Sequence, residues 1–329
     1  FDISFQITIP NEWEPMAPIN IGYTAGIETT KVAPIWLEKT NMMDKVIVVS
    51  NHAKQVFEAT SYKGQHKHTG QPMTLSCETP IEVVNYATRV YESAEVDLDF
   101  KHDFNYLLMA QWSARKNIEN AIRWFVEENI DEEVGLIVKT SIRRGCLVDR
   151  LETEKRLKRL LAEYKDRKCS VYLLHGDLTN EELGAIYRHP KIKTMITAAH
   201  GEGFGLPLFE AVCHGMPVIA AGWSGQTDFL YIPNNKGKMK AMFADVNYDI
   251  LPIQPEAVWD GVVQADSMWS WPHQGSFKIR LRQVRKSHKK WKEKAEKLQK
   301  WVLEEFSAEK QYKKFDAAIS YTILEQDDW

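Results

Sequence analysis

The stretch GEGFGLPLFEA, residues 201–211, decides the fold. Its glycines recur at every second position, and an apolar run follows at once. Small residues let a backbone approach a ligand closely, and the free N–H groups at a helix start favour an anion such as a phosphate. The stretch therefore predicts a tight turn that runs into a helix near Leu206 or Pro207, with an anion site at the turn.

Two carboxylates frame this turn. Glu202 lies within it, and Glu210 lies eight positions later in the expected helix. Carboxylates accept hydrogen bonds from hydroxyls and repel phosphates, so the pair suits hydroxyls on either side of a diphosphate, as in a nucleotide sugar. Glycine-spaced turns also serve close packing alone in α/β domains, and this structural interpretation stays open here.

Two other phosphate-binding motifs do not fit. After Gly201 and Gly203, the third glycine of the dinucleotide fingerprint would fall at Leu206. A P-loop is excluded because no Gly-Lys-Ser or Gly-Lys-Thr follows the glycines.

The segment after the turn completes a family pattern. The expected helix ends at Gly215, a buried strand follows, and the polar loop 224–228 comes next. This arrangement resembles the donor-binding segment of retaining glycosyltransferases of the family 4 type, with its E-x7-E motif and GT-B fold. The resemblance implies that Glu202 faces the donor sugar and that Glu210 binds the ribose. It also implies further donor contacts, which we assign to Gly203, Phe204, Gly205, Leu206, Leu178 and Thr227.

Three cations accompany the motif. Members of the family commonly carry an Arg directly after the first strand of the second domain and a Lys five residues later. This chain has Gln111 and Lys116 at those positions, which leaves Arg115 as the substitute. Lys139 ends the next expected strand, where side chains reach the same crevice. We predict that Arg115, Lys116 and Lys139 act with Glu202 in catalysis by stabilising the departing diphosphate. Ordinary solvated surface cations are the alternative.

The first part of the chain, residues 1–88, alternates strand and helix patterns and predicts a Rossmann-like parallel-sheet domain. By the resemblance, Gly26 and Glu28 lie on its acceptor side; an ordinary loop carboxylate is the alternative for Glu28. Relatives usually begin with further strands, so we expect this domain to be incomplete or truncated.

We place a linker at residues 89–103, a nucleotide-sugar domain at 104–304 and a final helix at 305–329. The predicted fold class is α/β, with two Rossmann-like domains of the GT-B type facing across a cleft and the final helix crossing back, as the resemblance implies. The basic stretch 278–294 predicts one amphipathic helix, which is a candidate contact to a membrane surface; a solvated surface helix is the alternative.

Composition limits the function classes. The chain has 329 residues and a net charge of −3, so no overall positive field favours nucleic acid. Its four cysteines lack pair spacing and fit reduced thiols. An Asp-x-Asp sequence at 97–99 lies in the expected linker and reads as a solvated loop. We expect no metal, no cofactor and a cytoplasmic location, with peripheral contact to the inner membrane face as an option.

The resemblance implies a hexosyltransferase that moves a sugar from a nucleotide-diphosphate donor to a hydroxyl acceptor with retention of anomeric configuration. The acceptor would be a glycan, a lipid-linked compound or a small molecule. Two alternatives remain, namely a hydrolysing nucleotide-sugar epimerase of the same fold and a catalytically incomplete remnant that binds nucleotide sugars.

Overall fold

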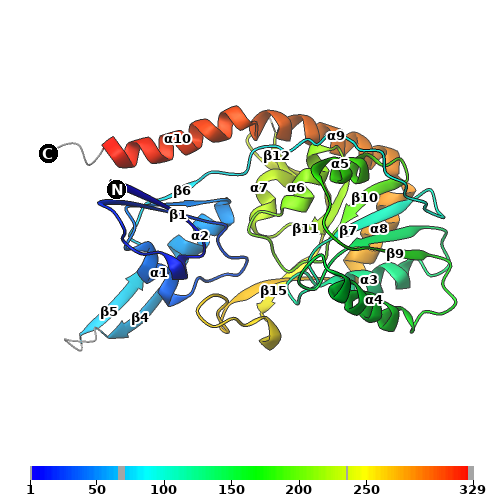
Figure 1. Cartoon of the computed structure of the whole chain (residues 1–329), viewed down its shortest axis with the longest axis horizontal. Helices are drawn as coiled ribbons and strands as arrows, with labels where there is room; N and C mark the ends of the chain where they lie inside the picture. Colours follow the sequence, from blue (N-terminus) through cyan, green and yellow to red (C-terminus); the bar gives the residue numbers. More distant parts are fainter. Residues whose placement is uncertain (1, 66–70, 235, 325–329) are drawn as a thin grey trace.

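The computed structural model describes residues 2–65, 71–234 and 236–324, with side chains up to residue 320. Two parallel sheets form its two halves (Figure 1). The first sheet has the order β1-β2-β3-β6. Its strands are β1 (Ile3–Ile7), β2 (Ile19–Thr24), β3 (Lys45–Val48) and β6 (Ile81–Val83). The predicted α/β class with parallel sheets is confirmed.

The second sheet has six strands in the order β14-β11-β10-β7-β8-β9. They are β7 (Asn105–Met109), β8 (Gly135–Lys139), β9 (Ser170–Leu174), β10 (Ile192–Ile196), β11 (Val218–Ala221) and β14 (Ala244–Val246). The chain starts in the middle with β7, builds one half outward and returns to β10 for the other half. This reversal between β7 and β10 is a topological switch point, and open α/β sheets bind ligands at such a point, in the crevice outside the carboxyl ends of the two strands.

Helices cover both faces of the second sheet because its strands are apolar on both sides. Leu107 belongs to the core under one layer, whereas Tyr106 and Leu108 belong to the core under the other, as the alternation of a strand requires. The first layer comprises α5 (Asn180–Arg188), α6 (Leu206–Cys213) and α9 (His288–Glu305). The second comprises α3 (Ile118–Glu128), α4 (Leu147–Leu161) and α8 (Gln274–Lys286).

The first sheet packs against two short helices around buried Trp13, Trp36 and Phe57. These helices are α1 (Pro34–Thr40) and α2 (Asn51–Ala59), and a hairpin of β4 (Ser61–Gln65) and β5 (Pro72–Ser76) follows them. The remaining elements of the second half are α7 (Thr227–Leu230) and two hairpins, β12 (Tyr231–Pro233) with β13 (Met239–Ala241) and β15 (Tyr248–Pro252) with β16 (Met268–Pro272).

Two segments cross between the halves (Figure 1). Residues 84–104 carry no helix or strand and run along the α5, α6 and α9 layer, where the Thr88 N–H donates to the Phe306 carbonyl and the Ala94 N–H to the Glu181 carbonyl. Helix α10 (Ala308–Leu324) extends over the first sheet, where the Phe315 ring meets Phe5 edge-on at 5.5 Å between centroids.

The predicted single basic helix over residues 278–294 is wrong. Ser287 has φ −123° and ψ 36°, which ends α8 and separates it from α9. The basic residues of α8 also face a protein surface rather than solvent alone. Lys278, Arg282 and Arg285 pair with Glu127, Glu128 and Glu132 of the α3 region. Every helix within the described residues is too short or too polar to cross a lipid bilayer.

Candidate functional site

The glycine-spaced turn connects β10 to α6 at the crevice between β7 and β10. Gly205 is the N-cap of α6 with φ +95°, a conformation that favours glycine, and α6 begins at Leu206 as predicted. No side chain caps this helix end, and Pro207 in its first turn carries no N–H. The start of α6 therefore presents backbone N–H groups and a partial positive charge to the crevice.

The other glycines of the turn allow the first domain to come close. A Cβ on Gly201 would lie 2.8 Å from the Glu28 carbonyl oxygen, and a Cβ on Gly203 would lie 2.8 Å from the Ala25 carbonyl oxygen. Gly26 has φ +74° and packs against Ala53. Gly201 and Gly203 thus serve close packing between the two halves, which was the structural interpretation left open above, whereas Gly26 serves packing within the first half.

Four of the predicted residues form one charge cluster. The Lys116 Nζ lies 2.5 Å and 2.6 Å from the two carboxylate oxygens of Glu202. Nη1 of Arg115 lies 3.3 Å from Oε2 of Glu202 and 3.0 Å from Oε1 of Glu28. Glu28 comes from the first domain, whereas the other three come from the second. The two cations and two carboxylates cancel in formal charge, so the cluster is neutral as a whole.

Backbone contacts hold this cluster in place. Arg115 donates from Nη1 to the Gly201 carbonyl at 2.9 Å, and the Glu202 N–H donates to Ser224 Oγ at 2.8 Å. Ser224 has φ +65°, and a Cβ on Gly225 would clash with the Gly203 carbonyl. The loop after β11 therefore packs tightly under the glycine turn and fixes the orientation of Glu202.

Burial shapes the electrostatics of the cluster. Burial raises the pKa of Glu28 despite the nearby Arg115. Burial opposes the positive charge of Arg115, but the carboxylates of Glu28 and Glu202 raise its pKa above the usual value. His200 stands beside the cluster, stacked on Trp269 at 4.7 Å between centroids, and burial lowers its pKa. His200 is therefore a neutral, packed side chain.

Glu210 lies in a different environment from Glu202. The Tyr91 hydroxyl donates to its Oε1 at 2.8 Å, and the Tyr187 hydroxyl donates to its Oε2 at 3.0 Å. Arg89 Nη1 is 3.7 Å from Oε1, and Glu210 is only 6% exposed. Tyr187 is on α5, whereas Arg89 and Tyr91 are on the segment that links the halves. Both oxygens of this carboxylate are thus occupied by hydroxyl donors.

Sequence reasoning missed these partners of Glu210. A buried tyrosine hydroxyl usually needs an acceptor, and Tyr187 on an otherwise apolar helix face is a weak signal of this kind. Tyr91 carries no such signal, because the segment around it has no periodic pattern.

The remaining predicted residues lie around the crevice without joining the charge cluster. Lys139 donates from Nζ to the Gly176 carbonyl at 2.6 Å, and burial lowers its pKa. Thr227 donates from Oγ1 to the Ser224 carbonyl at 2.7 Å. Phe204 is 3% exposed and meets Tyr86 at 5.3 Å between centroids. Leu178 and Leu206 are half-buried against the core on the α5 and α6 side of the sheet.

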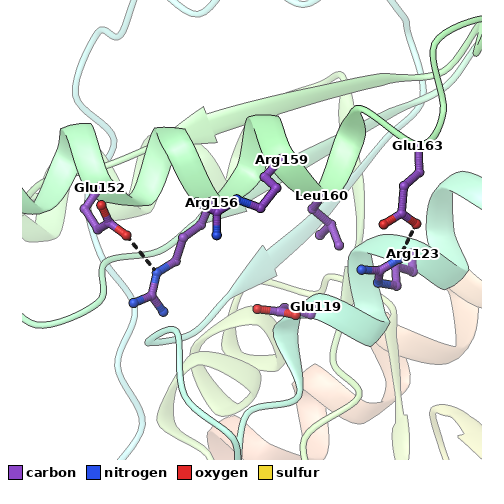
Figure 2. A pocket seen from close by; sticks show the side chains of 7 residues that line it. All are labelled: Glu119, Arg123, Glu152, Arg156, Arg159, Leu160 and Glu163. Carbon is purple, nitrogen blue, oxygen red and sulfur yellow. Dashed lines mark hydrogen bonds and ion pairs between the residues drawn. The ribbon is translucent and has the colours of Figure 1, made fainter.

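A separate cavity of about 310 Å³ lies between α3 and α4, on the other face of the sheet (Figure 2). It is lined by three arginines and three glutamates, and two ion pairs form among them. Arg156 reaches Glu152 at 3.3 Å, and Arg123 reaches Glu163 at 2.5 Å. The opposite charges balance, so this cavity is less suited to an anion than the crevice between β7 and β10.

No protein-family model and no curated protein matches this chain, but solved structures do. Sucrose-phosphate synthase from Thermosynechococcus elongatus matches with a TM-score of 0.58 and 17% identity, over 88% of this chain and 60% of that chain. The catalytic domain of starch synthase IV from Arabidopsis thaliana, bound to ADP and acarbose, matches with a TM-score of 0.56 and 12% identity, over 98% and 73%. TarM from S. aureus in complex with UDP matches with a TM-score of 0.55 and 12% identity, over 91% and 50%.

The chain thus spans 60% of the length of the sucrose-phosphate synthase that it matches. At these low identities the likeness concerns the fold. It agrees with the two parallel sheets of the structure. The chain has the GT-B fold of the glycosyltransferases, as the resemblance in its sequence predicted.

Proposed function

We propose that this protein is a glycosyltransferase that binds a nucleotide-diphosphate sugar in the crevice between β7 and β10. The observation that carries the proposal is the meeting of three features at one place, namely the uncapped start of α6, the cations Arg115 and Lys116, and the carboxylate of Glu202. Three of the similar structures contain UDP, ADP or UDP-2-fluoro glucose, which supports a nucleotide donor.

Lys116 links the sugar and diphosphate parts of this proposal. Its ammonium has three N–H donors and lies within hydrogen-bond distance of both carboxylate oxygens of Glu202. A diphosphate at the start of α6 would attract the ammonium and release part of the Glu202 carboxylate for sugar hydroxyls. The charge of the departing diphosphate is then stabilised by groups that are already in place, which is the largest contribution in many enzymes.

Glu210 is the proposed ribose acceptor. The two hydroxyl donors on its two oxygens offer the same chemistry as the two hydroxyls of a ribose. A ribose would replace the Tyr91 hydroxyl on Oε1, since this tyrosine comes from the linking segment and not from a core helix. Leu178 and Thr227 are proposed to border the base and the phosphates.

We further propose retention of anomeric configuration. His200 beside the cluster is stacked on Trp269, and its Nδ1–H donates to the Ser270 carbonyl at 2.7 Å, so we assign it no role as a catalytic base. A mechanism in which the departing diphosphate takes the proton of the acceptor hydroxyl requires no such base. Glu28 would then face the acceptor, a hydroxyl compound, through its shared contact with Arg115.

The first experiment is a thermal-shift panel of UDP, GDP and ADP with their sugar conjugates. A ligand at about a hundred times its dissociation constant stabilises a protein by roughly 2.7 kcal/mol, so a specific donor gives a clear shift. We expect one nucleotide series to stabilise the protein and Lys116→Met to remove the effect. No stabilisation of the folded protein by any of them would contradict a donor site.

Turnover assays then separate the classes of enzyme. Transfer to a hydroxyl acceptor, followed by NMR of the product, should give the anomeric configuration of the donor; inversion would overturn the proposed mechanism. Conversion of the nucleotide sugar without an acceptor would indicate an epimerase instead. Binding without any turnover would indicate a binding protein.

A further inference from the structure

A second pocket lies at the opposite end of α6 from the glycine turn. Its volume is about 370 Å³, within the range of small-molecule sites. Its basic lining residues are Arg188, Lys193, Lys292, His189, His214 and His288. Each histidine stands at a helix end, with His189 and His214 as the C-caps of α5 and α6 and His288 as the first residue of α9. We call it the basic pocket.

The basic pocket carries charge of one sign. Among the described residues that line it, none is Asp or Glu. Neither the Arg188 guanidinium nor the Lys193 ammonium forms an ion pair with any part of the chain that the structure describes. The cavity between α3 and α4 shows the contrast, because three glutamates among its lining residues balance its three arginines (Figure 2).

Burial and the nearby cations both act on the three histidines of the basic pocket. Burial lowers the pKa of His189, and Lys191 and Lys193 lower it further. The pKa of His288 is lowered by burial and then by Lys193 and Lys292, and that of His214 by burial and by Arg188. The same cations that disfavour a protonated histidine would favour a bound anion.

Helix ends account for two of the cations, because Arg188 lies in the last turn of α5 and Lys292 lies at the end of α6. The carboxyl end of a helix attracts positive charge, and Lys292 donates to the Gly215 carbonyl at 2.7 Å just beyond α6. Within residues 2–65, 71–234 and 236–320, the side chains of Arg188 and Lys193 donate to no carbonyl in this way. In addition, α9 begins at His288 without a side-chain cap, so its first N–H groups and partial positive charge lie beside the same pocket.

We propose that the basic pocket binds a phosphate monoester, held by Arg188 and Lys193 with the start of α9. The guanidinium fork suits two phosphate oxygens and the ammonium a third. The site differs from the proposed donor crevice in its cations, because Arg188 and Lys193 lie outside the charge cluster of Arg115 and Lys116; Tyr187, which lines the basic pocket, also donates to Glu210. The phosphate belongs either to a small soluble compound or to the headgroup of a lipid.

Calorimetry with glycerol 3-phosphate tests the soluble source. Flotation with phosphatidylcholine vesicles that contain phosphatidic acid tests the lipid source, because the lipid carries the same phosphate group; vesicles of phosphatidylcholine alone are the blank. The test variant is Arg188→Gln/Lys193→Gln. The matched control is Lys155→Gln/Lys165→Gln, which removes the same charge from exposed positions in the α4 region. Lys116→Met serves as a second control, which changes the proposed donor crevice and leaves every residue of the basic pocket in place.

The wild type and both controls should bind at least one probe. The test variant Arg188→Gln/Lys193→Gln should bind that probe about a hundredfold more weakly, because the loss of each charged contact weakens binding by about tenfold. NMR titration should show the pKa values of His189 and His288 rising when the probe binds, because an anion opposes the nearby cations. Equal affinity of the test variant and its matched control would overturn the proposal. Failure of both probes to bind the wild type at millimolar concentration would also overturn it. Loss of probe binding in Lys116→Met, with binding kept in Arg188→Gln/Lys193→Gln, would overturn it too.

Discussion

Glu202 and Glu210 belong to one short stretch of sequence, yet their carboxylates are held in opposite ways. Glu202 is paired with two cations, whereas Glu210 accepts hydrogen bonds from two tyrosine hydroxyls. The cations come from the loop after β7, across the crevice, and the tyrosines come from α5 and the linking segment. The Glu202 end of the motif is therefore suited to a ligand that brings a new charge, such as a diphosphate. The Glu210 end is suited to a ligand whose hydroxyls replace those of the tyrosines.

The largest expected effect on stability comes from removing the ion pair between Lys116 and Glu202. Lys116→Met leaves the mostly buried Glu202 without its nearest cation, and removal of one partner of such a pair is strongly destabilising. We expect the free energy of unfolding to fall by about 3 kcal/mol in urea denaturation at neutral pH. The double variant Lys116→Met/Glu202→Gln should recover most of this loss. A single variant as stable as the wild type would show that Arg115 alone satisfies Glu202.

Replacing each carboxylate should separate their roles in donor binding. We expect Glu210→Ala to weaken a nucleotide and its sugar conjugate alike, by about thirtyfold, since hydrogen bonds to a charged group contribute about 1.5–3 kcal/mol. Glu202→Ala should weaken discrimination between sugars more than it weakens nucleotide binding. Calorimetry with the nucleotide and with two sugar conjugates measures both effects. Equal nucleotide affinity of Glu210→Ala and wild type would reject the ribose assignment.

Removal of the Tyr91 hydroxyl tests whether a ribose hydroxyl replaces it on Glu210. In Tyr91→Phe the ribose no longer competes with a hydroxyl for Glu210 Oε1, so nucleotide affinity should rise by about fivefold, or about 1 kcal/mol. Tyr312→Phe, at a site where the side chain is 68% exposed, is the control. Weaker binding in Tyr91→Phe would indicate that the Tyr91 hydroxyl contacts the nucleotide itself.

The smallest expected effect concerns Asp228, a third carboxylate, which like Glu210 accepts hydrogen bonds from uncharged donors. Asp228 Oδ2 accepts from the Asn51 N–H at 2.9 Å and from the side-chain amides of Asn51 and Asn85 at 3.1 Å and 2.9 Å. Burial raises its pKa above 3.8. The folded state thus holds this proton more tightly than the unfolded state, and the contribution of Asp228 to stability is lost as pH rises through its raised pKa.

Asp228→Asn keeps an oxygen for these three donors and removes the charge. The variant should gain stability relative to the wild type as pH rises, by less than about 1 kcal/mol. Urea denaturation between about pH 4.5 and pH 7.5 measures the difference. A constant difference over this range would show that Asp228 titrates as it does in the unfolded chain.

Local sequence determined those features that depend on near neighbours along the chain. Gly205 and Gly215 have positive φ at the two ends of α6, as a glycine-spaced turn and a helix C-terminus require. Thr179 and Glu182 form the capping box of α5, as their spacing predicts. The parallel sheets follow from alternating apolar strands and helices.

Only the tertiary structure decided which side chains meet. The pairing of Glu28 with Arg115, the hydroxyls on Glu210 and the ion pairs between α8 and α3 join residues far apart in sequence. No local pattern encodes them, because they depend on how the two halves and the linking segment pack. The break at Ser287 has the same origin, since α8 and α9 pack on opposite faces of the sheet and a single straight helix cannot reach both.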